Sequence, residues 1–319
     1  MPELPEVETV VRGLRACLAG QRILSVRLGK TDFIDDPVAL GEQLPGRRVL
    51  GVERIGKFIC VQLGAGGEPA QSLETAELNG VSAGAQDIAP DLYWLVHLGM
   101  TGRLAVRAPE EPVVTHTHAF FELDDGKELR YTDIRRFGRM LLVPARGLAE
   151  FRSRLGEDAL FVSARTFAGQ VRRRRARIKA LLLDQQALRG MGNIYADESL
   201  WRARIHPMRL AASLRAEEIT RLHQAMQQVL RAAIELGGSS ISDFLDAEGK
   251  PGSYQMRHRV YGREGEKCYR CGARIQRVLV AGRSSHFCPR CQPAPRVVRK
   301  RRQAGGHWCG KLQARRGKR

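Results

Sequence analysis

The sequence predicts an α+β multidomain fold: an N-terminal helix plus an antiparallel β-sandwich, then a helical domain, then a small C-terminal module that carries cysteines. Three observations support this prediction. Apolar residues recur at helical spacing at the start of the chain and again after about residue 150, and short β-rich runs lie between. Four of the seven cysteines form two CxxC pairs near the C-terminal end. A chain of 319 residues is long enough for two or three domains.

The first element is a helix, expected over residues 4–18. Pro5 fits its first turn, where a missing N–H costs nothing, and two early glutamates lie near the positive end of the helix dipole. Its apolar residues share one helical face: Val7, Val10, Val11, Leu14 and Leu18.

Short strands follow, with apolar residues at a period of two. Such a series suggests an antiparallel sandwich or barrel. The β-rich runs are residues 22–28, 48–63, 92–99, 102–107, 118–123, 128–133 and 139–143. The stretch 64–91 is acidic, rich in Gly, Ala and Ser, and free of Lys and Arg, so we expect a long mobile loop inserted between two strands.

The pattern becomes helical after residue 150. We expect helices over 166–188, 194–204 and 216–236, the last of them stopped by a pair of glycines. Asn193 follows a glycine-rich tight turn and is well placed as the N-cap of the second of these helices. Residues 239–256 are expected to form a flexible loop.

These patterns divide the chain into four parts. We expect a first domain over 1–150 with the insertion 64–91, a helical domain over 151–256, a cysteine-bearing module over 257–292, and a disordered basic tail over 293–319.

The net charge points to a polyanionic partner. Lys and Arg number 53 against 34 Asp and Glu, which gives +19 and a pI near 10.3. The tail supplies +10 of this surplus, so the remaining +9 lies in the body. Nucleic acid is the usual partner of so basic a protein, and a merely soluble basic protein is the alternative.

The chain has no run of about 18 apolar residues that would span a membrane and no apolar signal-peptide core at its start. We therefore expect the protein to stay in a reducing cytoplasm. There its cysteines favour a metal site or free thiols over disulfides.

The two CxxC pairs have the spacing of a structural zinc site. Cys268 and Cys271 are separated by sixteen residues from Cys288 and Cys291. Two such knuckles can close a tetrahedral four-thiolate site with no position left for water, so we expect one structural Zn²⁺ and a zinc-ribbon β-hairpin. Four free thiols are the alternative, and His286 is a spare candidate ligand.

The second residue is a candidate nucleophile. Methionine before a small residue is usually removed, which would leave Pro2 as a terminal secondary amine. An α-amine has a pKa of about 8, so a substantial fraction is neutral at pH 7 and can attack the anomeric carbon of a deoxyribose. Glu3 is adjacent and could shuttle protons. The alternative is that both residues merely begin the helix.

The string PELPEVET closely resembles the start of formamidopyrimidine-DNA glycosylase, a family of bifunctional base-excision enzymes for oxidised purines. The resemblance continues, with gaps, as far as Cys291. It includes IGKF, HLGMTGRL, THTHAF, YTDIRRFGR, GMGNIYADESLWRARIHP, DFLDAEGKPGSY and VYGREGEKCYRCG. The related endonuclease VIII branch usually starts PEGPE and prefers oxidised pyrimidines, so Leu4 favours the first branch.

The resemblance implies a helix-two-turn-helix domain over 151–256, in which the loop 239–256 helps to enclose the lesion. It also implies a zinc finger over 257–292, damaged double-stranded DNA as the partner, no small-molecule cofactor, and a monomer in a bacterial cytoplasm, associated with the nucleoid. The insertion 64–91 and the basic tail depart from the family pattern.

The resemblance also implies catalytic roles. Pro2 would be the Schiff-base nucleophile and Glu3 the general acid for ring opening and glycosidic cleavage. Lys57 would donate a proton for β-elimination, although an exposed strand lysine is the alternative. Arg283 would serve δ-elimination and hold a phosphate.

DNA-binding roles follow in the same way. Asn193 would bind phosphate at a helix N-terminus, with plain capping as its alternative. Arg174 belongs to an arginine run that is otherwise a solvated helix face. The positions that match DNA contacts or the side chains that fill the gap left by an extruded base are His116, Arg135, Arg174, Met100 and Phe137. Strand core is the alternative for Met100 and Phe137. Glu198 is expected to order the site, or else to be a helix-surface carboxylate.

Together these features predict a glycosylase that removes oxidised purines and then cleaves the strand by β,δ-elimination. Two alternatives stay open: an endonuclease VIII-like glycosylase for oxidised pyrimidines, and a catalytically silent zinc-ribbon DNA-binding protein.

Overall fold

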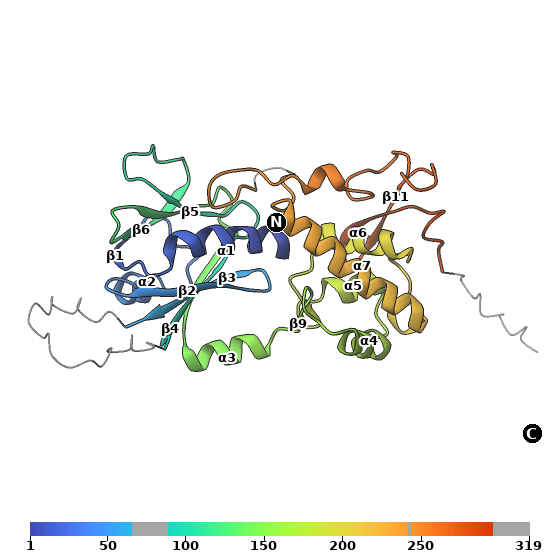
Figure 1. The fold of residues 1–319 in the computed structure, drawn as a ribbon, viewed down its shortest axis with the longest axis horizontal. Coiled ribbons are helices and arrows are strands. Elements are labelled where there is room, and N and C mark those ends of the chain that lie inside the picture. Colours follow the sequence, from blue (N-terminus) through green and yellow to red (C-terminus); the bar gives the residue numbers. More distant parts are fainter. Residues whose placement is uncertain (66–88, 242–243, 296–319) are drawn as a thin grey trace, which may run out of the picture.

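The computed structural model describes residues 1–65, 89–241 and 244–295. Figure 1 shows two lobes, with β-sheets on one side, helices α4–α7 and the strand β11 on the other, and the start of the chain between them. No helix in the described part of the chain is long and apolar enough to cross a membrane.

Helix α1 (Leu4–Leu18) has the bounds that the sequence predicts. Glu6 reaches back to accept a hydrogen bond from the Glu3 N–H at 2.8 Å, which satisfies a donor at the N-terminal end of the helix. The predicted apolar face is buried in the sandwich core. Because α1 packs on strand β2 and on helix α7, it belongs to both lobes.

The N-terminal lobe is the predicted antiparallel sandwich. In the described part of the chain, its strands form two four-stranded sheets of order β1-β6-β7-β5 and β2-β3-β4-β8. Trp94 and Phe121 pack between the sheets, with ring centroids 4.5 Å apart. The strands are β1 Ile23–Leu28, β2 Arg48–Ile55, β3 Phe58–Gly64, β4 Leu92–His97, β5 Arg103–Arg107, β6 Thr117–Leu123, β7 Glu128–Thr132 and β8 Arg139–Pro144.

The acidic stretch 64–91 joins two neighbouring strands. Strand β3 ends at Gly64, β4 begins at Leu92, and the two pair antiparallel with Leu63 opposite Leu92. The stretch is therefore inserted into a hairpin, as expected. Its residues 66–88 lie outside the described part of the chain.

Two helices of this lobe have no counterpart in the sequence prediction. Helix α2 (Pro37–Gln43) buries only Leu40, and α3 (Ala145–Ser153) buries only Leu148. One buried residue leaves no periodic apolar pattern, which explains why both were missed. Helix α3 runs through residue 150, the expected end of the first domain.

The C-terminal lobe contains the predicted helices, with one correction. The single helix predicted over 166–188 is wrong, because it is two helices, α4 (Ala164–Arg173) and α5 (Ile178–Leu183). Arg174 is extended, and the carbonyls of Arg174 and Ala176 accept hydrogen bonds from a neighbouring segment. Apolar spacing continues through the break, so spacing alone did not show it.

Helices α6 and α7 and the C-terminal hairpin follow the prediction closely, whereas β9, β10, η1 and η2 have no counterpart in it. Gly237 and Gly238 both have left-handed φ and end α7, as predicted. A two-residue turn at Ala281 and Gly282, with φ of 51° and 70°, closes the expected C-terminal hairpin. The elements are β9 Glu157–Asp158, β10 Leu188–Arg189, α6 Asn193–Ala203, η1 Ala211–Ser213, α7 Ala216–Glu235, η2 Tyr254–Arg257, β11 Gln276–Val280 and β12 Arg283–Phe287. Of the predicted tail, residues 296–319 lie outside the described part of the chain.

Candidate active site and metal centre

Pro2 lies in a pocket where the two lobes meet. The start of α1, the first turn of α6, the β4–β5 turn and the loop after α7 all contribute to its walls. The lining residues are Met1, Pro2, Glu6, Met100, Ile194, Ser239, Ile241 and Phe244. The structure thus brings Pro2 and Met100 together with the loop that was expected to enclose the lesion.

The Glu3 carboxylate caps helix α6 from a distance of nearly 200 residues in sequence. It accepts hydrogen bonds from the N–H groups of Ile194 (3.0 Å) and Tyr195 (3.4 Å). Gly192 makes this approach possible, because a Cβ there would lie 2.2 Å from the Glu3 carboxyl carbon. Burial raises the pKa of Glu3 to about 7, against the opposing influence of Lys57. Glu3 is therefore a carboxyl that can hold or release a proton near neutral pH.

The prediction that Asn193 is the N-cap is wrong. The N-cap is Gly192, Asn193 is the first residue of α6, and the capping acceptor comes from Glu3. A tertiary contact replaces the local cap, which neighbouring residues in the sequence do not reveal. The Asn193 Oδ1 atom is buried without a hydrogen-bond partner within the residues that the structure describes.

Glu6 is a second buried carboxyl that the sequence analysis did not single out. Besides the Glu3 N–H, it accepts hydrogen bonds from the Ser239 N–H (2.7 Å) and the Tyr195 hydroxyl. Burial raises its pKa. Gly238 packs against it, since a Cβ there would lie 2.8 Å from Glu6 Oε1. Glu6 thus ties the chain start to α6 and to the loop after α7.

Lys57 lies in the β2–β3 turn and is buried, so the alternative of an exposed strand lysine is wrong. Burial lowers its pKa, Glu3 raises it, and Arg283 lowers it further. Lys57 is therefore within electrostatic range of both residues. Arg283 itself is exposed at the start of β12. Pro2 and Glu3 directly precede α1, whereas Lys57 comes from the β2–β3 turn and Arg283 from the C-terminal hairpin.

A buried ion pair holds that hairpin against the helices. Lys179 Nζ lies 2.6 Å from Asp197 Oδ1 and donates a hydrogen bond to the Ser284 carbonyl at 2.7 Å. The other Asp197 oxygen accepts from the His286 N–H at 2.8 Å. Ser284 follows Arg283, so this interaction fixes the backbone beside the arginine. In the sequence, the only sign of this ion pair is that Lys179 lies within an apolar run.

Met100 and Phe137 lie on loops and project into solvent, with 41% and 56% of their surface exposed. The alternative that they form strand core is therefore wrong. The Arg135 guanidinium lies over the Phe137 ring, 4.6 Å from its centroid. Exposed apolar side chains beside an arginine, in loops at the pocket, are available to a partner molecule.

A single carboxylate organises both loops. Asp133 accepts hydrogen bonds from Thr101 Oγ1 (2.5 Å), Tyr131 Oη (3.1 Å) and the Gly138 N–H (2.9 Å). A Cβ at Gly99 would lie 2.4 Å from the Phe137 carbonyl carbon, so glycine is needed where the loops touch. Asp133 lies inside the motif YTDIRRFGR, although its role was not predicted.

His116 and Arg174 lie outside the Pro2 pocket. His116 is exposed before β6 and has a left-handed φ of 68°. Arg174 follows α4 and pairs with Asp184. It also lines a separate hollow with other arginines, namely Arg165, Arg172 and Arg173. The structure therefore does not bring His116 or Arg174 into the Pro2 pocket.

Glu198 is buried and connects the helical lobe to the cysteine module. Its carboxylate accepts hydrogen bonds from three consecutive N–H groups, those of Arg259, Val260 and Tyr261, each at 2.9 Å. It is therefore an ordering residue and not a helix-surface carboxylate.

The four predicted cysteines converge on one point. Their sulfur atoms all lie within 4.8 Å of one another, and Cys271 Sγ is 3.4 Å from Cys288 Sγ. A tetrahedral zinc–thiolate site has sulfur atoms about 3.8 Å apart, so the donor set fits one structural Zn²⁺. His286 is not part of this group, because its ring faces Asp197.

Comparison with known families agrees with this architecture. The formamidopyrimidine-DNA glycosylase N-terminal domain matches residues 1–140, and the formamidopyrimidine-DNA glycosylase H2TH domain matches 155–245. The zinc finger found in FPG and IleRS matches 265–294. The matches confirm the predicted fold class and the structural zinc.

Individual proteins agree over nearly their whole length. The chain is 42% identical to a formamidopyrimidine-DNA glycosylase of Solibacter usitatus, covering 92% of this chain and 99% of that protein. It is 42% identical to one of Desulforamulus reducens, with 92% and 100% covered. A crystal structure of a Lactococcus lactis FPG mutant with Fapy-dG containing DNA is 33% identical, with a TM-score of 0.78 and coverage of 92% and 100%. The chain therefore belongs to the formamidopyrimidine-DNA glycosylase family, as its resemblance predicted.

Proposed function

We propose that this protein is a base-excision DNA repair glycosylase that removes oxidised purines from duplex DNA and then cleaves the strand by β,δ-elimination. The observation that carries the proposal is the pocket lined by Pro2, together with the adjacent Glu3 carboxyl, whose pKa burial raises to about 7, and the buried Lys57, which feels the charge of Glu3. Membership of the family supports the same activity.

Pro2 acts as the nucleophile in this proposal. Once Met1 is removed, its neutral amine forms a bond to C1′ of the damaged nucleotide as the bond from C1′ to the base breaks. The departing base takes a proton from Glu3, whose raised pKa keeps part of the carboxyl protonated at neutral pH. The Pro2 nitrogen returns its proton to Glu3, the C1′–O4′ bond then breaks, and O4′ takes up that proton from Glu3. The iminium that results acidifies the sugar for the eliminations that follow.

Lys57 and Arg283 serve those eliminations. Burial lowers the pKa of Lys57, which makes its proton easier to give up, and Lys57 lies within electrostatic range of Glu3, so we assign it to assist the β-elimination. Arg283 stays cationic and is exposed at the hairpin tip, so it can hold the phosphate that leaves. The structural zinc would shape the hairpin, with Cys268, Cys271, Cys288 and Cys291 as its ligands.

We propose that Met100, Arg135 and Phe137 occupy the gap that an extruded base leaves in the duplex. The exposure of the two apolar side chains and the stacking of Arg135 on Phe137 support this role. His116, Arg174 and Asn193 are proposed to bind phosphates. We also propose domains over 1–150, 151–256 and 257–292, a basic tail over 293–319, and action as a monomer at the nucleoid of a bacterial cytoplasm.

Borohydride trapping tests the proposal. The enzyme is incubated with duplexes that contain 8-oxoguanine and, in parallel, thymine glycol, and the imine is then reduced. We expect a covalent adduct, faster on the purine lesion, that Pro2→Gly diminishes. Binding without an adduct supports the silent DNA-binding alternative, and a faster adduct on thymine glycol supports the endonuclease VIII-like one.

A further inference from the structure

Hydrogen bonds hold the loop after α7 together at its base, around Ser240, and at its tip, around Asp246. At the base, Ser240 Oγ donates to the Phe244 carbonyl at 2.7 Å and accepts from the Gly252 N–H at 2.9 Å. At the tip, the Asp246 carboxylate accepts from the Lys250 N–H at 2.7 Å. The described residues 244–252 therefore form a closed unit that moves as a body if its tip is displaced.

The tip of this loop packs against helix α1 at Gly13. Ala247 is buried in the sandwich core, and a Cβ at Gly13 would lie 2.8 Å from Ala247 Cβ. Glu248 Oε1 would lie 2.6 Å from the same point, but that atom is the end of a flexible side chain. The Ala247 methyl has no such freedom. Any side chain at position 13 must therefore displace the tip.

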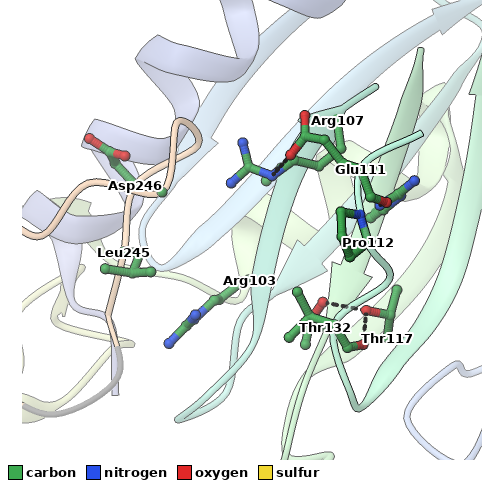
Figure 2. A pocket seen from close by; sticks show the side chains of 12 residues that line it. Arg103, Arg107, Glu111, Pro112, Thr117, Thr132, Leu245 and Asp246 are labelled. Carbon is green, nitrogen blue, oxygen red and sulfur yellow. Dashed lines mark hydrogen bonds and ion pairs between the residues drawn. The ribbon is translucent and has the colours of Figure 1, made fainter. Parts of the chain in front are cut away.

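A cavity lies beside the middle of the loop. Figure 2 shows it between the loop and strand β5, with Leu245 and Asp246 on one side and Arg103 and Arg107 on the other. The cavity leaves part of the loop without support from the sheet, so the contact at Gly13 is one of a few local anchors, beside Phe244 in the sandwich core and Arg107, whose Nη2 atom would lie 2.9 Å from a Cβ at Gly249. A change of one methyl group at Gly13 is therefore expected to move the loop.

The same loop walls the pocket of Pro2. Ile241 and Phe244 line that pocket together with Pro2 and Met100. Phe244 precedes Ala247 by three residues and also packs against the sandwich core. The position of the tip on α1 consequently sets the position of the pocket wall.

We propose that Gly13 is a positioning residue for base excision. Because Gly13 has no side chain, Ala247 can pack directly against α1. This contact holds Phe244 in the wall of the pocket that receives the extruded base. This inference rests on the proposed function. Gly13 touches no reacting group, so its effect is confined to the step that needs a base in the pocket.

Gly13→Ala tests the inference without weakening the helix, because alanine is favoured over glycine in a helix interior. Gly41→Ala in α2 is the matched control, since nothing lies within 4 Å of a Cβ at Gly41. Each protein is assayed for excision of 8-oxoguanine from a duplex and, separately, for incision of a duplex with a pre-formed abasic site. Hydrogen exchange is followed in the peptide that covers residues 244–252.

We expect Gly13→Ala to lower kcat/KM for excision by about 10- to 100-fold, as small misplacements in an active site do. Incision of the abasic duplex stays within about twofold, because no base has to be held. Exchange in the loop becomes faster. Removing the methyl that clashes, in Gly13→Ala/Ala247→Gly, restores much of the excision activity, and Gly41→Ala matches the wild type.

Equal losses in excision and abasic incision would overturn the inference, as would unchanged excision or a failure of the Ala247→Gly change to rescue. Failure of the proposed function is a separate outcome, because it would appear in the wild type as an absence of excision and incision.

Discussion

The two sides of the Pro2 pocket are built in opposite ways. On one side, burial raises the pKa values of the Glu3 and Glu6 carboxyls, against the opposing effect of the hydrogen bonds that they accept. On the other side, Met100 and Phe137 are exposed on loops that a buried carboxylate holds in place. Burial thus shifts the proton affinity of the carboxyls on one side, whereas the apolar side chains on the other side stay accessible to a partner, which we propose is DNA.

Substitutions on the two sides are therefore expected to differ in their effects on stability and on activity. Buried polar groups contribute to both, because their removal leaves partners unsatisfied. Exposed side chains contribute little to the free energy of unfolding, so replacing them is expected to change only activity. The predictions below test that separation, from the largest expected effect to the smallest.

The largest effect is expected in the buried ion pair behind the hairpin. Asp197→Ala leaves Lys179 charged and without its partner, which is expected to lower the free energy of unfolding by about 3–5 kcal/mol. Urea unfolding measures this loss. The matched control is Glu150→Ala in the exposed pair with Arg154, expected to change stability by at most about 1 kcal/mol. Similar losses in both variants would contradict the account.

The next effect is a pH dependence set by Glu3. Its folded pKa of about 7 lies above the ordinary value of 4.5, so the folded state binds this proton more tightly. Stability from this group is therefore complete below about pH 4.5 and is lost as pH rises through 7, by about 3 kcal/mol at most.

Glu3→Gln removes that titration and is expected to flatten the stability profile between about pH 4.5 and 7.5. Unfolding in urea at several pH values measures the slope. Glu6 remains in both proteins, so the difference between the two slopes reports the Glu3 titration together with its coupling to Glu6 and Lys57. Identical slopes in the two proteins would argue against a raised pKa at Glu3.

The exposed side should behave differently. Phe137→Ala is expected to lower excision of 8-oxoguanine by about tenfold or more, since the wedge is removed, while stability changes by at most about 0.5 kcal/mol. The ratio of excision to DNA binding is the informative quantity. A large loss of stability would place Phe137 in the core and contradict the comparison of the two sides.

The smallest effect concerns the basic tail. Removing residues 296–319 takes away ten Lys and Arg, and each phosphate that the tail no longer neutralises reduces the salt slope of DNA binding by about 0.9. We expect a flatter slope and unchanged excision at saturating enzyme. An unchanged slope measured by fluorescence anisotropy would mean that the tail does not bind DNA.

The sequence predicted the fold where its signal was local. Helix α1 and the strands followed from apolar periodicity, and the zinc ligands followed from spacing. Helices α2 and α3 were missed because each buries a single residue. The break at Arg174 was missed because it depends on pairing with a distant segment.

In the candidate site, too, local sequence patterns predicted some residues and missed others. Pro2, Glu3, Lys57 and Arg283 were named from motifs; Pro2 lines the pocket, and the charge of Lys57 is coupled to those of Glu3 and Arg283. Their supports were not predicted, since Glu3 caps α6 from afar, Glu6 joins three segments and Asp133 fixes two loops. Such interactions link residues far apart in sequence, and no local pattern records them.

The central claim is that the amine of Pro2 attacks the sugar, and identifying the trapped atom tests it most directly. The borohydride-reduced adduct is digested and the modified peptide is located by mass spectrometry. The account predicts that the sugar remnant is attached to Pro2 of a polypeptide that lacks Met1. An adduct on Lys57, or a fully active protein that retains Met1, would contradict it.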